Sequence, residues 1–316
     1  MSIGFFLSCE EYTPAELVEQ ARLAEEAGFE ALWISDHYHP WTDAQGQSPF
    51  VWSVIGAISQ VCQLPVTTAV TCPIMRMHPA IVAQAAATAA VQLDGRFRLG
   101  VGTGEALNEH IVGRGWPEEE VRLEMLDEAV SIMRDLWSGE TVSHRGPHFT
   151  VENARVYTRP DGPIPVYVSA FGDKAFELAC RIGDGFITTS PDADRVARWR
   201  ERAPGRTAQG GVKVCVAPTV DEAAAAAHRR WATSGLPGEL SQVLPSPRHF
   251  EQAAALVTEE MTRASVPLGP DPQVHLRAVR EYVDAGFDEV YVAPMGPYWR
   301  DLFPMFAETV LPAVRG

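Results

Sequence analysis

The sequence lacks the long apolar segments and the cysteine pairs that mark several classes of protein. No stretch of about 18 apolar residues occurs without a charge, so we expect no membrane-spanning helix. The N-terminus has no basic region before an apolar run, and Glu10 and Glu11 follow almost at once, which argues against a signal peptide. The five cysteines are widely spaced and include no Cys-x-x-Cys pair. They predict free thiols in an intracellular protein, with neither a disulfide framework nor a zinc site.

Basic residues are also scarce. The chain has 26 Lys and Arg against 41 Asp and Glu, a formal net charge of −15, and no run of Lys or Arg. Proteins that bind nucleic acids need such clusters, because much of their affinity comes from neutralising phosphates and releasing counterions. We therefore expect no nucleic-acid partner, and the acidic surface is typical of a cytoplasmic protein with a small-molecule substrate.

Hydrophobic residues make up 46% of the 316 residues, and their pattern predicts an α/β fold. Short apolar runs alternate with longer amphipathic segments, as parallel strands alternate with crossover helices. Eight such runs are present, which is the number that closes a (β/α)8 TIM barrel. The predicted strands are Ile3–Leu7, Ala31–Ile34, Val66–Val70, Phe97–Val101, Pro165–Val168, Gly185–Thr188, Val212–Val216 and Glu289–Val292. The predicted helices are Pro14–Ala27, Ser48–Val61, His78–Leu93, Pro117–Trp137 and Asp173–Ile182.

A weak internal repeat also favours the barrel. The segment Ala27-Gly28-Phe29 before the second predicted strand recurs as Ala285-Gly286-Phe287 before the last, and Gly183-Asp184-Gly185-Phe186 is a looser copy. A glycine that ends a helix can adopt a positive φ, and the aromatic residue after it can plug the layer below the next strand. Such corners belong at the bottom of a barrel, although coincidence among common tripeptides is the alternative.

The regular alternation fails in two places. Residues from about 138 to 163 are rich in turn formers and predict a short hairpin between the fourth and fifth units. Residues 234 to 272 carry six prolines around one predicted helix, Phe250–Arg263. Insertions in barrels lie in loops, where they either shape the site or simply embellish the fold. We expect one domain over residues 1–316 that carries these two insertions.

Barrel enzymes take their reacting groups from the residues that follow the strands. Glu10 follows the first predicted strand, His37 and Trp41 follow the second, and Glu105 follows the fourth. His37 is the best candidate for proton transfer, because an imidazole titrates near neutrality. Trp41 could form one wall of a substrate pocket. His37 and His39 could also ligate a metal, but no carboxylate–histidine spacing of a metalloenzyme accompanies them, so we predict no metal site.

Two segments could bind a cofactor. Leu99–Glu105 fits neither the Rossmann nor the Walker spacing, but it ends a strand without side-chain bulk, so a flat ring could lie close to its backbone. A tight turn with a solvated Glu105 is the alternative. After the fifth predicted strand, residues 170–172 precede a helix whose first turn bears Lys174. Free backbone N–H groups there could hold a phosphate with added charge from Lys174, or they could form an ordinary capped helix.

Three motifs together point to a known family. They are Ser-Cys-Glu-Glu-Tyr-Thr-Pro at residues 8–14, Ser-Asp-His-Tyr-His-Pro-Trp at residues 35–41, and Gly-Val-Gly-Thr-Gly-Glu-Ala-Leu-Asn-Glu at residues 100–109. The sequence resembles the luciferase-like flavin and deazaflavin superfamily and, more narrowly, the coenzyme F420-dependent glucose-6-phosphate dehydrogenase family. The resemblance implies a (β/α)8 barrel, usually a homodimer, which binds coenzyme F420. It also implies hydride transfer between a hydroxyl-bearing carbon and the deazaflavin C5.

The resemblance implies roles for single residues. His37 would be the base that takes the hydroxyl proton, Trp41 would support the transition state, and Glu105 would share the proton at the reduced ring. Glu10 would complete this catalytic set, and Asp36 would help to bind the coenzyme. The end of the third predicted strand matches a segment that contains a non-proline cis peptide in this superfamily. The other implied coenzyme-binding positions are Ala69, Val70, Thr103, Asn108, Ala170, Phe171 and Gly172, and Lys174 joins them through its place in the helix.

One departure from the family pattern concerns the substrate. The sugar-phosphate enzymes place a phosphate-binding lysine soon after the strand that matches residues 185–190, whereas Pro191 and Asp192 follow here. An aspartate repels a phosphate dianion, although Arg263 could stand where another phosphate-binding cation is expected. We therefore hypothesise an alcohol, sugar or sugar-phosphate dehydrogenase whose substrate need not be phosphorylated. The alternatives are an FMN-dependent luciferase-like monooxygenase and a non-catalytic coenzyme-binding protein.

Overall fold

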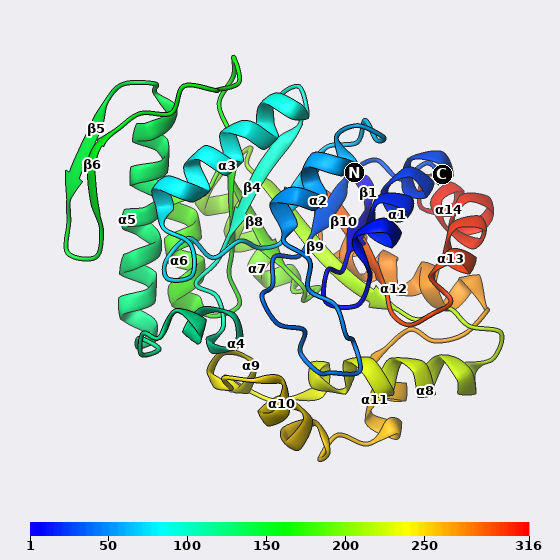
Figure 1. The fold of residues 1–316 in the computed structure, drawn as a ribbon. Coiled ribbons are helices and arrows are strands. Elements are labelled where there is room, and N and C mark those ends of the chain that lie inside the picture. Colours follow the sequence, from blue (N-terminus) through cyan, green and yellow to red (C-terminus); the bar gives the residue numbers. More distant parts are fainter. Residues whose placement is uncertain (316) are drawn as a thin grey trace.

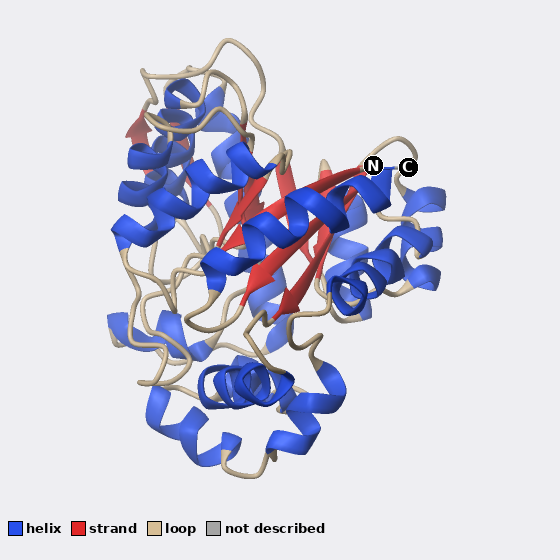
Figure 2. Ribbon diagram, turned by 90° about the vertical axis from the view of Figure 1, so that its right-hand side faces the viewer, coloured by secondary structure: helices blue, strands red, loops and turns tan. Residues whose placement is uncertain are grey.

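The computed structural model describes residues 1–315, and its centre is a closed barrel of parallel strands (Figure 1). Around the barrel the strands follow the order β1-β10-β9-β8-β7-β4-β3-β2. Helices surround the strands, as Figure 2 shows. This arrangement confirms the predicted (β/α)8 barrel. The barrel strands are β1 Ser2–Leu7, β2 Leu32–Ile34, β3 Val66–Thr68, β4 Phe97–Val101, β7 Val166–Ser169, β8 Gly185–Thr188, β9 Thr207–Val214 and β10 Glu289–Pro294.

The longer helices lie on the outside of the barrel, and their ends follow local sequence signals. At the start of α1, the Thr13 side chain accepts a hydrogen bond from the Glu16 backbone N–H, and the Glu16 carboxylate accepts one from the Thr13 backbone N–H. The helices around the barrel are α1 Pro14–Ala27, α2 Val51–Ile58, α3 Pro79–Gln92, α5 Glu119–Trp137, α6 Asp173–Ile182, α7 Ala193–Arg202, α12 Pro272–Asp284 and α13 Trp299–Met305. The other helical segments are α4 Ala106–Glu109, η1 His110–Val112, α8 Val220–Trp231, η2 Ala232–Gly235, α9 Leu240–Val243, α10 Pro247–Ala254, α11 Glu259–Ser265, a π-helical turn over Phe306–Val310 and α14 Leu311–Arg315.

Two copies of the predicted helix-to-strand corner have the expected geometry. Gly28 and Gly286 both have a φ of 90°, and the phenylalanines after them, Phe29 and Phe287, are buried. The looser third copy differs, because Gly183 has a φ of −84° and ends α6 in an extended conformation. The left-handed corner is therefore confirmed at the first and last units and is wrong for the third.

The two irregular regions also form definite structures. The antiparallel hairpin of β5 Val142–Arg145 and β6 Thr150–Ala154 lies outside α5, as predicted (Figure 1). In the second region, the single predicted helix Phe250–Arg263 is wrong in its continuity, since it is divided into α10 and α11. The Thr258 side chain accepts a hydrogen bond from the Met261 backbone and so begins a new helix. In both views, the helices α8 to α11 lie beyond the end of the barrel to which the strands point (Figures 1 and 2).

Large aromatic side chains fill the barrel interior. The rings of Trp33 and Tyr291 are stacked, with centroids 4.3 Å apart. Glycines on neighbouring strands make room for them: a Cβ on Gly4 would lie 2.4 Å from the Tyr291 ring, and one on Gly211 would lie 2.5 Å from the Trp33 ring. The interior is therefore a packed core.

A buried polar network lies beneath these rings. The Trp33 indole N–H donates to Gln209 Oε1 at 2.9 Å, and Gln209 Nε2 donates to Glu289 Oε2 at 2.6 Å. Arg98 Nη1 donates to both carboxylate oxygens of Glu289, at 2.8 and 2.7 Å, and the Tyr291 hydroxyl donates to the same carboxylate. These bonds compensate the burial of polar groups and close the amino-terminal end of the barrel.

Within residues 1–315, no helix has the length and hydrophobicity needed to cross a membrane.

Candidate active site

The carboxyl ends of β1, β2 and β4 bring the four predicted catalytic residues into one cluster. His37 Nε2 lies 3.3 Å from Glu10 Oε1, and the His37 and Trp41 rings lie 5.0 Å apart in an edge-on arrangement. Asn108 Nδ2 joins the cluster to Glu105, donating to Glu105 Oε2 at 3.3 Å. Residues that are far apart in the sequence thus meet at one mouth of the barrel.

Asn108 also contacts the His37 ring. Its Oδ1 accepts hydrogen bonds from the backbone N–H groups of Tyr38 and His39, at 2.9 and 3.1 Å, which fixes the orientation of the amide. The Asn108 NH₂ group therefore faces His37 Nδ1 at 3.1 Å as a donor. The His39 carbonyl oxygen lies 3.2 Å from the same nitrogen as an acceptor, so Nδ1 has a partner in either tautomer of the neutral ring.

The Glu10 carboxylate is held in place by its own hydrogen bonds. The Ser35 hydroxyl donates to Glu10 Oε2 at 2.5 Å, and the Cys9 backbone N–H donates to the same hydroxyl at 2.8 Å. Glu10 is buried, so its second oxygen is available mainly to His37. A carboxylate fixed in this way stabilises positive charge on the imidazole.

Asp36 lies behind His37 and takes part in a buried ion network. Its Oδ2 accepts a hydrogen bond from the Thr71 hydroxyl at 2.9 Å, and its Oδ1 pairs with Arg76 Nη2 at 2.8 Å. Glu109 accepts from the Arg76 backbone at 2.7 Å and lies 3.5 Å from its Nε. Burial raises the pKa of Glu109 to about 7, and the contacts with Arg76 oppose this rise. The network fixes the loop that carries His37.

Glycines at the end of β4 let this strand approach the end of β3, where the predicted Ala69 and Val70 lie. The Ala69–Val70 peptide bond is cis, as the family resemblance implied. A Cβ on Gly100 would lie 1.8 Å from the Thr68 carbonyl oxygen, and one on Gly102 would lie 2.8 Å from Val70 Cγ2. Strand packing therefore requires glycine at both positions. The predicted Thr103 follows Gly102 at the mouth and is half-buried.

One buried polar atom at the mouth has no partner among residues 1–315. Ser8 follows β1 at the position that alternates with Gly4 and Phe6, both of which face the interior aromatic rings. The Ser8 hydroxyl is buried and makes no hydrogen bond. Such a group is suited to a polar ligand, and this observation fits a polar ring system bound at the mouth.

The predicted phosphate-binding segment lies at the start of α6. Ala170 is buried and Phe171 is 56% exposed, and Gly172 is the N-cap residue without a side-chain hydrogen bond. Lys174 is also exposed, and its ammonium group pairs with Glu119 and Glu120. Its ammonium group therefore lies between α5 and the start of α6, where the backbone N–H groups of the first turn are further donors.

Several residues that build the mouth were not predicted from the sequence. Glu11 accepts hydrogen bonds from Arg230 Nη1 at 2.7 Å, Trp231 Nε1 at 2.6 Å and the Gly296 backbone N–H at 2.8 Å. Burial raises the pKa of Glu11, and the bond from Arg230 opposes this rise. On the other side, Phe250 packs edge-on against Trp41, 5.0 Å between ring centroids. No local pattern marks these contacts, because each joins residues more than 200 positions apart.

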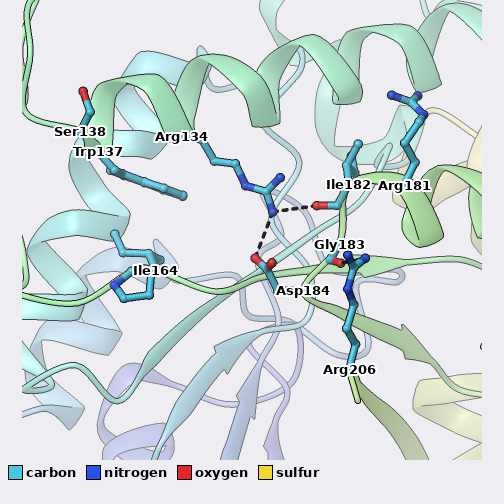
Figure 3. A pocket seen from close by; sticks show the side chains of 10 residues that line it. Arg134, Trp137, Ser138, Ile164, Arg181, Ile182, Gly183, Asp184 and Arg206 are labelled. Atoms are coloured by element: carbon cyan, nitrogen blue, oxygen red, sulfur yellow. Dashed lines mark hydrogen bonds and ion pairs between the residues drawn. The ribbon is translucent and has the colours of Figure 1, made fainter. Parts of the chain in front are cut away.

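A separate cavity of about 420 Å³ lies at the amino-terminal ends of β7, β8 and β9 (Figure 3). Arg134 is prominent in it and donates to the Ile182 carbonyl at 2.8 Å and to Asp184 at 3.0 Å. No predicted site residue lines this cavity. Residues at this end of a barrel generally contribute to stability. The contacts of Arg134 do so by joining α5 to the end of α6 and the start of β8.

Comparisons with known proteins relate the whole chain to one group. Residues 1–289 match a family model described as luciferase-like monooxygenase. The F420-dependent glucose-6-phosphate dehydrogenase of Microbacterium testaceum is 34% identical over 330 residues, covering 100% of this chain and 98% of that protein. The enzyme of the same name from Kribbella flavida is 36% identical over 328 residues, covering 99% and 98%.

Solved structures agree with these relatives. An F420-dependent secondary alcohol dehydrogenase in complex with an F420-acetone adduct superimposes with a TM-score of 0.92 at 33% identity, over 100% of this chain and 99% of that one. A coenzyme F420-dependent tetrahydromethanopterin reductase from Methanopyrus kandleri gives a TM-score of 0.77 at 21% identity, over 99% of each chain. The second likeness shows the shared fold alone.

Proposed function

We propose that the chain is a coenzyme F420-dependent oxidoreductase acting on CH–OH donors. It belongs to the luciferase-like monooxygenase family, and it matches F420-dependent dehydrogenases over its whole length. The observation that carries this proposal is the contact between His37 and Glu10 at the barrel mouth, beside Trp41. Bound there, the coenzyme would accept hydride at its deazaflavin C5.

The surroundings of His37 support its role as the base that takes the hydroxyl proton. A fully protonated imidazole has two N–H donors. Glu10 Oε1 lies 3.3 Å from Nε2, and the His39 carbonyl lies 3.2 Å from Nδ1, so an acceptor is present for each. In the neutral ring, a proton on Nδ1 that faces the His39 carbonyl leaves Nε2 free to take the hydroxyl proton, which Glu10 then accepts as a hydrogen bond. The site can therefore hold both the neutral ring and the imidazolium that proton uptake produces.

The remaining assignments follow the family pattern. Trp41 would line the pocket beside the reacting carbon, and Glu105, oriented by Asn108, would share a proton at the edge of the reduced ring. The unpartnered hydroxyl of Ser8 supports a polar ligand at this mouth. The residues that we propose to hold the coenzyme are Asp36, Ala69, Val70, Thr103, Asn108, Ala170, Phe171, Gly172 and Lys174.

Arg263, considered above for phosphate binding, and Arg230 at the mouth are both paired with carboxylates, which favours a substrate without a phosphate. Arg263 pairs with Asp221 at 2.9 Å and with Glu259 at 2.7 Å. Arg230 pairs with Glu11 at 2.7 Å. Because these charges are already compensated, they are weak partners for a dianion. A secondary alcohol without a phosphate is the class that we propose.

The proposal is tested with purified protein and oxidised coenzyme F420. Secondary alcohols such as propan-2-ol and butan-2-ol should remove the visible absorbance of the coenzyme, and glucose 6-phosphate should be a poor substrate. His37→Gln should lower kcat by about 10²–10⁴-fold while coenzyme binding, followed by fluorescence titration, is kept. His148→Gln, on the distant hairpin, is the matched control and should remain fully active.

Three results would contradict the proposal. Oxygen consumption with reduced FMN, without any coenzyme F420 reduction, would identify the monooxygenase alternative. Coenzyme binding without turnover of any alcohol would favour a carrier. Full activity of His37→Gln would remove the assigned base.

The proposal includes a homodimer. Phe50 and Ile81 are large apolar residues that are 54% and 56% exposed, and they line a shallow groove of about 260 Å³ between α2 and α3. Exposed apolar patches of this kind favour protein contacts. Sedimentation equilibrium should give twice the chain mass of 34.6 kDa, and Ile81→Glu should give the monomer mass. A monomeric wild-type protein would contradict this part of the proposal.

The proposal also takes residues 1–316 as one domain in the cytoplasm, without a nucleic-acid partner. The five cysteines are free, which suits a reducing compartment. The net charge of −15 opposes contact with phosphate backbones. Limited proteolysis should leave one core fragment, and filter binding should detect no retention of DNA or RNA.

A further inference from the structure

Lys213 lies on β9 with its side chain directed to the barrel interior. Residues 209 and 211 of the same strand face inward, since Gln209 bonds Trp33 and a Cβ on Gly211 would meet the Trp33 ring. Strand alternation therefore directs Lys213 inward as well, one layer closer to the mouth. Its neighbour on β10 is Ala293, a small residue that leaves space beside the lysine.

The Lys213 ammonium has only uncharged contacts. Its Nζ lies 3.1 Å from the Ser234 hydroxyl and 4.2 Å from the centre of the Trp231 ring. Among residues 1–315, no carboxylate approaches it within ion-pair distance. Burial lowers the pKa of Lys213 to about 8, and the more distant charges of Glu10 and Glu11 oppose this shift. A half-buried cation without a counterion is costly.

The other cations near the mouth are already paired. Arg76 bonds Asp36, and Arg230 bonds Glu11. Lys174 and Lys213 are the two lysines of the sequence, and Lys174 pairs with two glutamates of α5. Lys213 thus differs from the other cations near the mouth, because no carboxylate among residues 1–315 pairs with its ammonium group.

We propose that Lys213 is a specificity-determining residue that binds the carboxylate of a hydroxy-acid substrate whose carbinol carbon reacts at His37. This inference rests on the proposed function and narrows its substrate class. One ammonium matches one negative charge, whereas a phosphate dianion would leave an uncompensated charge near Glu10 and Glu11. Lysine also acts as a point charge, without the bidentate fork by which arginine recognises phosphate.

The test compares matched substrates in the wild-type enzyme and two variants, with coenzyme F420 present. The substrates are 3-hydroxybutyrate, its neutral amide 3-hydroxybutanamide, butan-2-ol and glucose 6-phosphate. The wild type should prefer the acid to the amide, and Lys213→Met should lower kcat/KM for the acid by about 10–100-fold. The same variant should keep kcat/KM for the amide and for butan-2-ol within about 2-fold. Lys213→Arg, which keeps the charge, should recover most of the preference for the acid.

A second readout needs neither coenzyme nor turnover. Reductive methylation followed by mass spectrometry reports each lysine separately, and 3-hydroxybutyrate should protect Lys213 while the amide does not. Lys174 serves as the internal control and should react equally in both cases. If no alcohol is oxidised but the acid still protects Lys213, the proposed function is wrong and the carboxylate site stands.

Several results would overturn the inference itself. Equal kcat/KM for the acid and the amide in the wild type would do so, as would an unchanged ratio in Lys213→Met. Equal methylation of Lys213 with and without the acid would also do so. If glucose 6-phosphate is the favoured substrate and Lys213→Met abolishes its turnover, the site binds phosphate and the carboxylate assignment is wrong.

Discussion

The buried ion network behind His37 makes the stability of the protein depend on pH through Glu109. Its pKa is about 7 in the folded chain, against an ordinary value of 4.5. Below pH 4.5 the carboxyl is protonated in both states, so its charge has no effect. Between pH 4.5 and 7 it ionises only when the chain unfolds, which favours the unfolded state. A shift of this size corresponds to a loss of about 3 kcal/mol, complete above pH 7.

Glu109→Gln removes this titration and leaves Arg76 paired with Asp36. The free energy of unfolding of the wild type, measured relative to that of the variant, should therefore fall by about 3 kcal/mol between pH 4.5 and 7.5. For a chain of this size that equals a relative change in Tm of about 4–5 °C. Thermal unfolding followed by tryptophan fluorescence at pH 5, 6, 7 and 8 measures it, and the comparison cancels the other titrating groups. Parallel pH curves for the two proteins would refute the reasoning.

Three other substitutions test separate contacts. Gly100→Ala places a Cβ 1.8 Å from a backbone carbonyl of β3, so little folded protein should be recovered, as circular dichroism of the expressed protein would show. Asn108→Leu removes the amide that orients the His37 loop and leaves the backbone N–H groups of Tyr38 and His39 without their acceptor; kcat should fall at least about 10-fold and the free energy of unfolding by about 1–3 kcal/mol, and a fully active variant would contradict this role. Trp231→Phe leaves the buried Glu11 one donor short and should cost about 1–3 kcal/mol in urea unfolding, whereas no loss of stability would show that water replaces the indole.

Much of the fold could be predicted because the barrel strands are short apolar runs between amphipathic helices. The bounds of β4, β8, α1 and α6 agree with the prediction. The strand β9 begins at Thr207, five residues before the predicted Val212, because Gln209 and Gly211 face the aromatic interior, Gly210 packs against Tyr282 on the outer side, and all three interrupt the apolar pattern. A strand that supplies polar and small residues to a crowded core is difficult to identify from hydropathy.

The site could be predicted only in part. The rule that reacting groups follow barrel strands placed Glu10, His37 and Glu105 on one rim, and the structure brings them together. Arg76 was missed because it lies in a loop without a periodic pattern. Lys213 was missed because a lone lysine in a predicted strand gives no sign of which face it occupies. Both depend on contacts between distant segments, which the sequence does not encode locally.

The stacked pair of Trp33 and Tyr291, with the network of Glu289 beneath it, obstructs passage along the barrel axis. Molecules can therefore enter and leave only through the mouth where His37 lies. If two reactants meet there, as the proposed function requires, the one that lies deeper must arrive first and depart last. Steady-state kinetics should then follow a compulsory order of addition, with product inhibition competitive only towards the first partner.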